Sequence, residues 1–286
     1  MISRDDMTLH EAIERLSDRH KPSTKDLASE RNEEGTSWDL NTSFSQARAL
    51  AEGGWTDKAD DLWQFVRALS PKVEIGTAMR FDVTGESVDV GRYLSGEPEC
   101  MISELVTPQS AVKVLVNISA ASACDATIMF NRGIALAAII HALQSSGRGV
   151  SLTIVENVTG GRGEHETTVE LQRFGDYINP GRLAFWVAHP AALRRCVFRY
   201  NEQQSNAVRD QFGFRDGGGY GYPNEMSETA RSGDAPEGVV CIPYLKYRDE
   251  YEYRTPEIAL RTLIELFKKK NIPIEIQGVM SGDSAP

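Results

Sequence analysis

Hydroxyl and amide side chains gather in one short stretch near the middle of the chain, at Asn117, Ser119 and Ser122. This stretch follows directly on the apolar segment 111–118, AVKVLVNI, whose β-branched residues are typical of a buried strand. Oxygen atoms of this kind can bind a hard cation, contact a ligand, or cap the helix that follows. The position matters because open parallel sheets bind their ligands just beyond the carboxyl ends of their strands.

Negative charge is scarce around this stretch. A divalent cation takes several oxygen ligands, normally including at least one carboxylate. Asp125, in the same segment, and Asp249, beyond a later strand, are the acids that could compensate. A helix cap or a structural turn is the alternative that needs no ligand. We predict no cofactor, with Mg²⁺ as the exception to be tested. The candidate binding residues are Asn117, Ser119, Ser122, Asp125 and Asp249.

Other arrangements that carry chemistry are missing from the sequence. The glycine-rich run 160–163 is not followed by the helix start that a phosphate-binding loop needs, and no G-x-S-x-G elbow occurs. The cysteines are far apart, which argues against a zinc site or a disulfide framework and favours buried thiols. They are Cys100, Cys124, Cys196 and Cys241. We therefore predict no catalytic residues.

Acidic residues also surround a predicted β-hairpin, in which strands 81–83 and 88–90 flank a turn at 84–86. A pair of these carboxylates could act as general acid and base. A solvated hairpin face explains the same residues without a ligand, and we favour it. The acids are Asp82, Asp89, Glu97 and Glu99.

The elements that would position the candidate site follow the order of an α/β domain. The strand at 111–118 precedes an apolar segment from Ile128 that should be a buried helix, and a second strand begins at Val150. Such a strand, crossover helix and strand form a right-handed parallel unit. Further elements expected are an edge-like strand at 167–174, a helix around 183–188 that Pro190 ends or kinks, an irregular region at about 201–238, a strand at 239–245, a helix at 255–271 and a last strand at 272–279.

The chain divides into four parts on this interpretation. Residues 1–42 are polar and are predicted to be a flexible N-terminal arm that orders against a partner. Residues 43–108 form a helical and β-hairpin extension, with a helix at 56–69. Residues 109–280 form the α/β domain, and 281–286 are a tail.

The order of these elements resembles the von Willebrand factor A-type fold. In that family the first strand ends in D-x-S-x-S, a long buried helix follows, and an antiparallel edge strand comes after the second strand. Asn117 here stands at the aspartate, Ser119 at the first serine and Ala121 at the second, and the later strand VVCIPYL lacks the family's T-D-G. The segment NIPIEIQGV, 271–279, matches the family's last helix–strand unit. The resemblance, over 111–279, implies a Rossmann-like, mostly parallel sheet flanked by helices, with a degenerate metal site.

Composition is that of a globular protein, with 41% hydrophobic and 25% charged residues. No apolar run approaches the roughly 20 residues of a membrane helix, and the N-terminus lacks the features of a signal peptide, so we expect a cytoplasmic protein. The net charge of −10 disfavours general binding to nucleic-acid phosphates. A nucleic-acid module would need its basic residues, such as Arg194, Arg195 and 268–270, on one face.

The whole chain also looks like uncharacterised proteins of tailed bacteriophages, through the segments GGW, VDVGRYLSGEPECM and LAFWVAHPAALRR. That resemblance implies no activity, but it implies the cytoplasm of a host cell. We predict a non-enzymatic protein-binding or assembly protein, a scaffold that forms a homo-oligomer or binds a protein partner. The alternative is a metal-dependent enzyme that acts on nucleotides or nucleic acid at the carboxyl ends of the strands.

Overall fold

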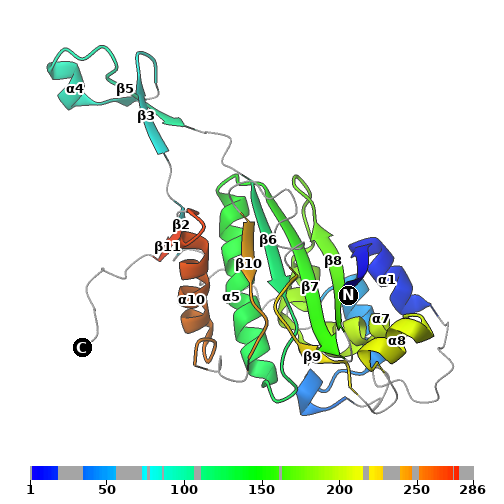
Figure 1. The fold of residues 1–286 in the computed structure, drawn as a ribbon. Coiled ribbons are helices and arrows are strands. Elements are labelled where there is room, and N and C mark those ends of the chain that lie inside the picture. Colours follow the sequence, from blue (N-terminus) through cyan, green and yellow to red (C-terminus); the bar gives the residue numbers. More distant parts are fainter. Residues whose placement is uncertain are drawn as a thin grey trace.

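A mixed α/β sheet forms the centre of the computed structural model (Figure 1). The structure describes residues 2–18, 35–55, 73–75, 78–85, 87–105, 111–160, 163–214, 219–227, 239–246, 251–272 and 274–276. The strands of the main sheet are, in spatial order, β1 (Ile2–Thr8), β8 (Gly163–Gln172), β7 (Val150–Gly160), β6 (Val112–Asn117) and β10 (Val239–Ile242), and the short β9 (Tyr222–Pro223) pairs with the far end of β7. The pairs β1–β8, β7–β6 and β6–β10 are parallel, whereas β8 runs antiparallel to β7. The predicted α/β class, with a mostly parallel sheet flanked by helices, is confirmed.

One face of this sheet is buried by the large hydrophobic core. Alternate residues of β6, Val112, Val114 and Val116, belong to that core, as their spacing along a strand requires. The opposite face carries a smaller cluster around Leu115 and Val155. The helices of the body are α1 (Leu9–Ser17), η1 (Ser37–Asp39), α2 (Phe44–Gly53), α5 (Ala126–Ser145), α6 (Pro180–Ala188), the π-helical segment η3 (Ala192–Val197), α7 (Phe198–Glu202), α8 (Asn206–Phe212) and α10 (Pro256–Lys268).

The long helix α5 lies within the core. Its side chains are apolar on all sides, and most of them are buried, as the sequence predicts. By length and composition α5 could cross a membrane, but it packs against α6 and α10 inside the body. The helix is therefore part of the core of the folded body.

Residues 2–17 lie in the main sheet and in α1, whereas the sequence analysis places them in a flexible arm. β1 pairs with β8 along its whole length, and Thr8 and Glu11 form a reciprocal capping box at the start of α1. β1 is a polar strand held by its backbone ladder and by ion pairs such as Arg15 with Asp5, at 2.7 Å, so it has no apolar alternation to reveal it. Because β8 lies between β1 and β7, the prediction that β8 is an edge strand is wrong.

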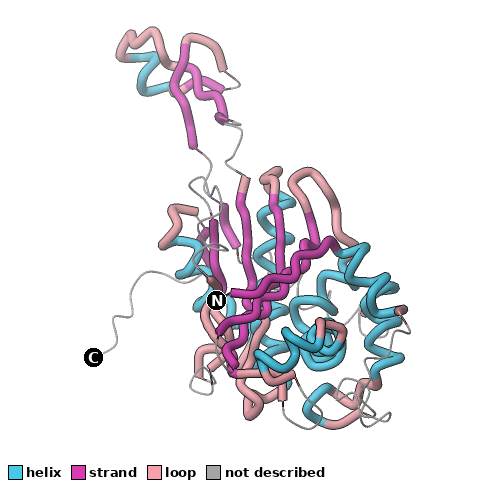
Figure 2. Tube along the Cα trace, turned by 45° about the vertical axis from the view of Figure 1, so that its right-hand side comes forward, coloured by secondary structure: helices cyan, strands magenta, loops and turns pink. Residues whose placement is uncertain are grey.

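Two smaller sheets lie beside the main one. β3 (Ala78–Asp82) and β4 (Ser87–Val88) both pair with β5 (Met101–Leu105), and α4 (Val90–Leu94) joins β4 to β5. This unit projects from the body (Figures 1 and 2). The predicted hairpin is wrong because β5 lies between β3 and β4. β11 (Ile274–Ile276) pairs with β2 (Val73–Ile75) in a separate sheet, so the last predicted strand does not extend the main one.

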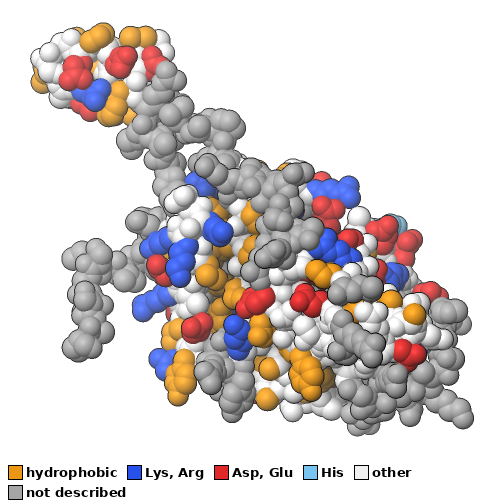
Figure 3. Space-filling model, in the orientation of Figure 1, with side chains coloured by type: hydrophobic (Ala, Val, Ile, Leu, Met, Phe, Trp, Pro, Cys, Tyr) orange, Lys and Arg blue, Asp and Glu red, His pale blue; other side chains and the backbone are white. Residues whose placement is uncertain are grey.

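The acids of the projecting unit have local structural partners. Asp89 caps α4 by accepting from the Arg92 N–H at 3.0 Å, and Glu97 forms an ion pair with Arg92 at 3.2 Å. Acidic side chains of this unit reach the surface, among apolar ones, in Figure 3. The arrangement agrees with a solvated face.

Several local predictions in the C-terminal half are confirmed, and one is corrected. α6 ends at Ala188, directly before His189 and Pro190, and Thr255 caps α10. The region 201–238, expected to be irregular, contains α8 and β9. The predicted helix at 56–69 lies outside the described residues.

Gly133 marks the close approach of α5 to α6. A Cβ atom added at Gly133 would lie 2.3 Å from the Cα atom of Ala188 and 2.4 Å from the carbonyl oxygen of Val187. Backbone atoms cannot move away from the added Cβ atom as a flexible side chain can. We therefore predict that Gly133→Ala lowers the free energy of unfolding by about 1–3 kcal/mol, measured by urea denaturation. Gly53→Ala is the control, because nothing lies within 4 Å of its added Cβ atom. Equal stability of the two variants would contradict this packing.

Candidate functional site

The strap, which comprises residues 222–227, crosses the carboxyl ends of β6 and β7. It begins with β9, which pairs with β7, and the Asn224 N–H donates to the Asn157 carbonyl at 2.9 Å. The Asn117 side-chain amide donates to the Asn224 carbonyl at 2.8 Å, and the Asn157 amide donates to the Glu225 carbonyl at 2.7 Å. Two asparagines at the ends of neighbouring strands thus hold the strap by its backbone.

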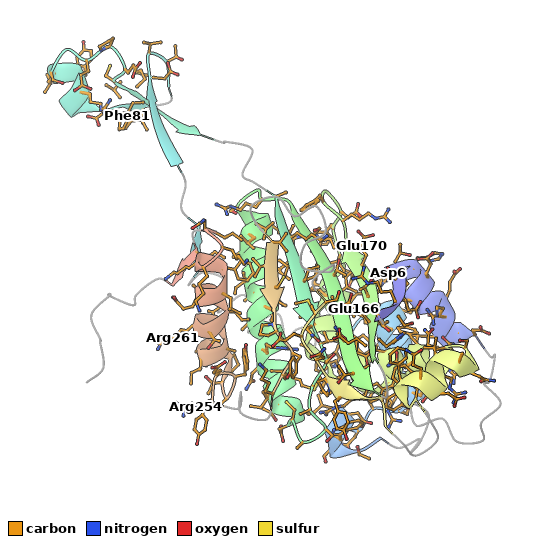
Figure 4. All side chains as sticks on the ribbon, viewed as in Figure 1. Asp6, Phe81, Glu166, Glu170, Arg254 and Arg261 are labelled. Carbon is orange, nitrogen blue, oxygen red and sulfur yellow. The ribbon has the colours of Figure 1, made fainter. Side chains whose placement is uncertain are left out.

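Glu166 on β8 fixes the far end of the strap (Figure 4). Its carboxylate accepts from the backbone N–H and from the hydroxyl of Ser227, both at 2.9 Å. Arg4 on β1 forms an ion pair with Glu166 at 3.4 Å and donates to the Ser227 hydroxyl at 2.8 Å. Asn117, Asn157, Glu166 and Arg4 are called the polar row below. All four come from different strands of the main sheet, so the strap is tied across the sheet.

Ser119 closes the hydrogen-bond ladder between β6 and β7. Its hydroxyl donates to the Asn157 carbonyl at 3.2 Å and accepts from the Asn157 N–H at 3.0 Å. The Asn117 side-chain oxygen accepts from the Ser119 N–H at 3.0 Å. The two central residues of the predicted site are therefore brought together, but their oxygens already hold the backbone of their neighbours.

Arg132, from α5, occupies the crevice between the carboxyl ends of β6 and β10. Its guanidinium donates to the Asn117 carbonyl at 3.2 Å and to the Pro243 carbonyl at 2.9 Å. Strand order reverses here, because β7 and β10 lie on opposite sides of β6, and open α/β sheets bind ligands at such a point. A guanidinium is permanently charged, so it repels a second cation from this crevice.

The remaining predicted residues are scattered. Ser122 is exposed, and its carbonyl accepts from the Trp38 indole N–H at 3.0 Å. Asp125 caps α5 by accepting from the Thr127 N–H at 2.7 Å, and this hydrogen bond lowers the pKa of Asp125. Asp249 lies outside the described residues. Within the described part of the chain no three His, Cys, Asp or Glu side chains form a group able to hold a metal.

A cavity of about 570 Å³ opens beside this point, against the ends of β6 and β7. It is called the strand-end cavity below. Its walls are mainly apolar and aromatic, and Glu156 is the one acid among the described residues that line it. The lining residues are Trp38, Ser119, Ala120, Ala121, Ser122, Glu156, Val158, Gly160, Leu193, Phe198, Phe212, Gly213, Gly219, Tyr220, Gly221, Tyr222 and Pro223.

Glu156, near the end of β7, carries the strongest electrostatic perturbation in the cavity wall. Its side chain is buried, and both carboxyl oxygens accept from the Asn201 amide at 3.0 Å. Burial raises the pKa of Glu156 to about 8, outweighing the lowering effect of the Asn201 hydrogen bond. Glu156 therefore holds a proton at neutral pH and presents a carboxylic acid to an apolar cavity.

Neutral groups support Glu156 from behind. Thr167 donates to the Asn201 side-chain oxygen at 3.4 Å and contacts His165 Nε2 at 3.2 Å. His165 lies between Phe212 and Phe214, and burial lowers its pKa to about 4, so it is neutral as well. The chain of contacts positions Glu156 without supplying a charge.

The aromatic wall is held by buried arginines. Arg194 lies over the Trp38 ring, 4.2 Å from its centroid, and donates to the Trp38 carbonyl. Arg195 forms a buried ion pair with Asp39 at 2.6 Å, which fixes η1 beside the cavity. These arginines therefore serve as structural anchors and do not form the basic surface that a nucleic-acid module would need.

Next to Trp38, whose ring centroid lies 6.2 Å from that of Phe198, the wall contains a stacked pair of rings. Tyr220 stacks on Phe198 with ring centroids 3.8 Å apart, and the Tyr220 hydroxyl donates to Glu202. This contact attaches the segment before the strap to α7. The cavity wall is thus built from α7, η1 and the strap as well as from the sheet.

Glu156, Asn157 and Glu166 were missed by the sequence reasoning. A signal existed for two of them, because Glu156 and Asn157 end the apolar strand VSLTIVEN much as Asn117 ends AVKVLVNI. Trp38 had no local signal, since it comes from a polar region far away in the sequence.

A family model described as "Domain of unknown function (DUF7192)" matches residues 7–274. The matched span includes every residue that lines the strand-end cavity and all of the polar row except Arg4. The comparisons with curated proteins and with solved structures gave no match.

The pKa of Glu156 predicts a specific pH dependence of stability. The pKa rises from 4.5 to about 8 on folding, so the contribution to stability is full below pH 4.5, falls as the pH rises and is constant above about 8. Glutamine at position 156 cannot ionise. We therefore expect the free energy of unfolding of Glu156→Gln, relative to that of the wild type, to increase by up to roughly 1.4 kcal/mol per pH unit between pH 4.5 and about 8. Urea denaturation at about pH 5, 7 and 9 measures the difference. Glu265→Gln, on the exposed side of α10, is the control, and a pH-independent difference for Glu156→Gln would contradict the assignment.

The Asp39–Arg195 ion pair is predicted to hold η1 in the cavity wall. Asp39→Ala leaves the Arg195 guanidinium buried without its carboxylate, which should cost about 3–5 kcal/mol of stability. It should also release η1, so that Trp38 fluorescence shifts to the red before global unfolding in urea. Asp176→Ala, at an exposed position between β8 and α6, should change stability by no more than about 0.5 kcal/mol. Equal effects of the two changes would show that the pair does not hold the wall.

Proposed function

The chain belongs to the DUF7192 family, and we propose that it is a non-enzymatic protein-binding or assembly protein built on a von Willebrand A-like domain. In this proposal the strand-end cavity receives part of a protein partner, without a metal ion. The observation that carries it is the cavity itself, which lies at the carboxyl ends of the strands and has aromatic walls. Aromatic side chains in a concave site supply binding energy through buried area.

The order of elements supports the von Willebrand A-like assignment. β6, the buried helix α5, β7, the antiparallel β8, β10 and α10 follow one another as the resemblance implies. Two features depart from it, because β1 adds a strand beyond β8 and β11 pairs outside the main sheet. Neither β1 nor β11 pairs with β6 or β7, the strands whose carboxyl ends border the cavity.

The chemistry of the strand ends supports binding without a metal. Arg132 places a positive charge in the crevice, and the Ser119 hydroxyl is already bound to the Asn157 backbone on two sides. A hydroxyl held in this way is also a poor nucleophile, because its partners among the described residues are backbone groups and not a side-chain base. The enzyme alternative therefore has less support than the binding function.

A phage setting completes the proposal. The pattern of the whole chain resembles tailed-bacteriophage proteins, which supports a role in the host cytoplasm as an oligomeric scaffold or as part of a heteromeric complex. Mass measurement in solution by light scattering tests the assembly, since a monomer with no partner at any concentration would count against it.

The cavity rim offers a matched test of partner binding. Tyr222 lies on the rim of the cavity and Tyr177 lies between β8 and α6, and the two side chains are 78% and 75% exposed. We expect the immobilised full chain to retain a partner from producing cells. Tyr222→Ala should reduce its capture by roughly tenfold, in the range of a binding hot spot. Tyr177→Ala should leave capture unchanged, and an equal effect of the two changes would exclude the cavity as the binding site.

Metal dependence separates the binding protein from the enzyme. EDTA should leave capture unchanged, and Mg²⁺, Mn²⁺ and nucleotides should leave the melting temperature unchanged, because a ligand that binds the native state must raise it. A magnesium-dependent rise that Ser119→Ala abolishes would support the enzyme and overturn the proposal.

A further inference from the structure

We propose that the strand-end cavity accepts a basic side chain of the partner, from lysine or arginine, whose cationic end pairs with the Glu156 carboxylate. This inference rests on the proposed function and specifies the chemistry that the cavity recognises. It makes Glu156 the group that decides which side chain binds.

The geometry of the cavity fits a long side chain with a charged end. Among the described residues that line the cavity, Glu156 is the one acid, and it is 1% exposed, behind apolar and aromatic groups. The volume of about 570 Å³ exceeds the need of one lysine or arginine side chain, so flanking residues of the partner also fit. The methylene stem of such a side chain can pack on apolar walls while its charged end reaches a polar group.

The walls also favour a cation over an anion. The faces of aromatic rings attract cations, and Arg194 already lies over the Trp38 ring at 4.2 Å. Tyr220 and Tyr222 add further rings to the lining. The net charge of −10 on the whole chain steers a basic partner toward the protein and disfavours an acidic one.

The described charged groups on η3 and α7, two elements that line the cavity, have partners of their own. On η3, Arg194 donates to the carbonyls of Cys124 and Trp38, and Arg195 pairs with Asp39. On α7, Arg199 lies 3.7 Å from Glu202, and Glu202 accepts from Tyr220.

Two further polar groups in the chain of contacts that supports Glu156 are neutral. They are Asn201 on α7 and His165 on β8, and burial lowers the pKa of His165. Among the described residues of this wall, Glu156 is therefore the group whose charge can change when a ligand binds.

Binding of a cation must release the proton of Glu156. The carboxyl is neutral in the empty cavity because burial raises its pKa, and an opposite charge within a few ångströms lowers that pKa again. The proton leaves to solvent and the carboxylate pairs with the cation. Affinity for a cation should then increase as the pH rises toward about 8 and level off above it.

Peptide probes test this directly on the full chain. A blocked tetrapeptide with one lysine is titrated by isothermal calorimetry at about pH 6, 7 and 8.5, in pairs of buffers with different ionisation enthalpies. We expect affinity to rise by up to roughly tenfold per pH unit below pH 8, with close to one proton released per peptide. The same peptide with norleucine, which keeps the stem and lacks the charge, should bind weakly and without pH dependence. An arginine peptide should behave as the lysine peptide does.

Glu156→Gln is the decisive variant. The glutamine keeps the shape of the side chain and an oxygen that accepts from Asn201. Because glutamine cannot ionise, we expect the variant to be at least as stable as the wild type. It should lose proton release, the pH dependence and the preference for lysine over norleucine. Retention of that preference in Glu156→Gln, or lysine and norleucine peptides that bind alike, or preferential binding of a glutamate peptide, would each overturn the inference. Capture that depends on Tyr222 would still stand in those cases, so the two proposals fail separately.

Discussion

The hydrogen bonds between the polar row and the strap are the constraint on which the strand ends depend. β7 runs to Gly160, whereas its neighbour β6 ends opposite Val155, so β6 does not pair with the last part of β7. Buried backbone groups need partners, and β9 and the rest of the strap supply them. Asn117 and Asn157 then hold the strap carbonyls, and Glu166 holds its far end. The strap therefore closes one wall of the cavity where β7 extends beyond β6.

This wall changes what the strand ends can do. The side-chain oxygens of Asn117 and Ser119 already form hydrogen bonds with backbone groups. The Arg132 guanidinium lies between the ends of β6 and β10, where the strand order reverses. The open space is displaced toward Glu156, where the strap, η1 and α7 enclose it. The cavity proposed as the binding site therefore lies beside the strand ends, and its described lining is apolar and aromatic apart from a few polar groups such as Glu156.

The sequence predicted the elements whose stability is local and missed the contacts that depend on distant partners. α5 was predicted because it is apolar on every side, and α10 because Thr255 and Pro256 mark its start. β1 was missed because backbone pairing and ion pairs, which leave no periodic pattern, hold a polar strand. The β3–β5–β4 order was missed because local turn residues suggest a hairpin, whereas pairing to β5 depends on a strand further along the chain.

The candidate site shows the same division. Asn117 and Ser119 were found because two polar residues end a buried strand, but the pattern could not show that their oxygens face backbone. Glu156 follows the apolar residues of β7 in a similar way, and burial by residues far away in the sequence raises its pKa against the lowering effect of the Asn201 hydrogen bond. Sequence position therefore located the edge of the sheet where the proposed site lies, and tertiary burial decided which of its residues has a perturbed pKa.

Burial of Glu156 has a thermodynamic consequence that favours a role in binding. Holding its proton at pH 7 costs the folded state roughly 3 kcal/mol relative to a group with the ordinary pKa of 4.5. An amide of the same shape would accept the Asn201 hydrogen bond without that cost. Natural sites that lower stability are commonly functional ones, because the energy lost in folding becomes available when a ligand relieves it. In the proposed complex a cation in the strand-end cavity offsets this cost to stability, because it stabilises the Glu156 carboxylate in place of the water that burial removes.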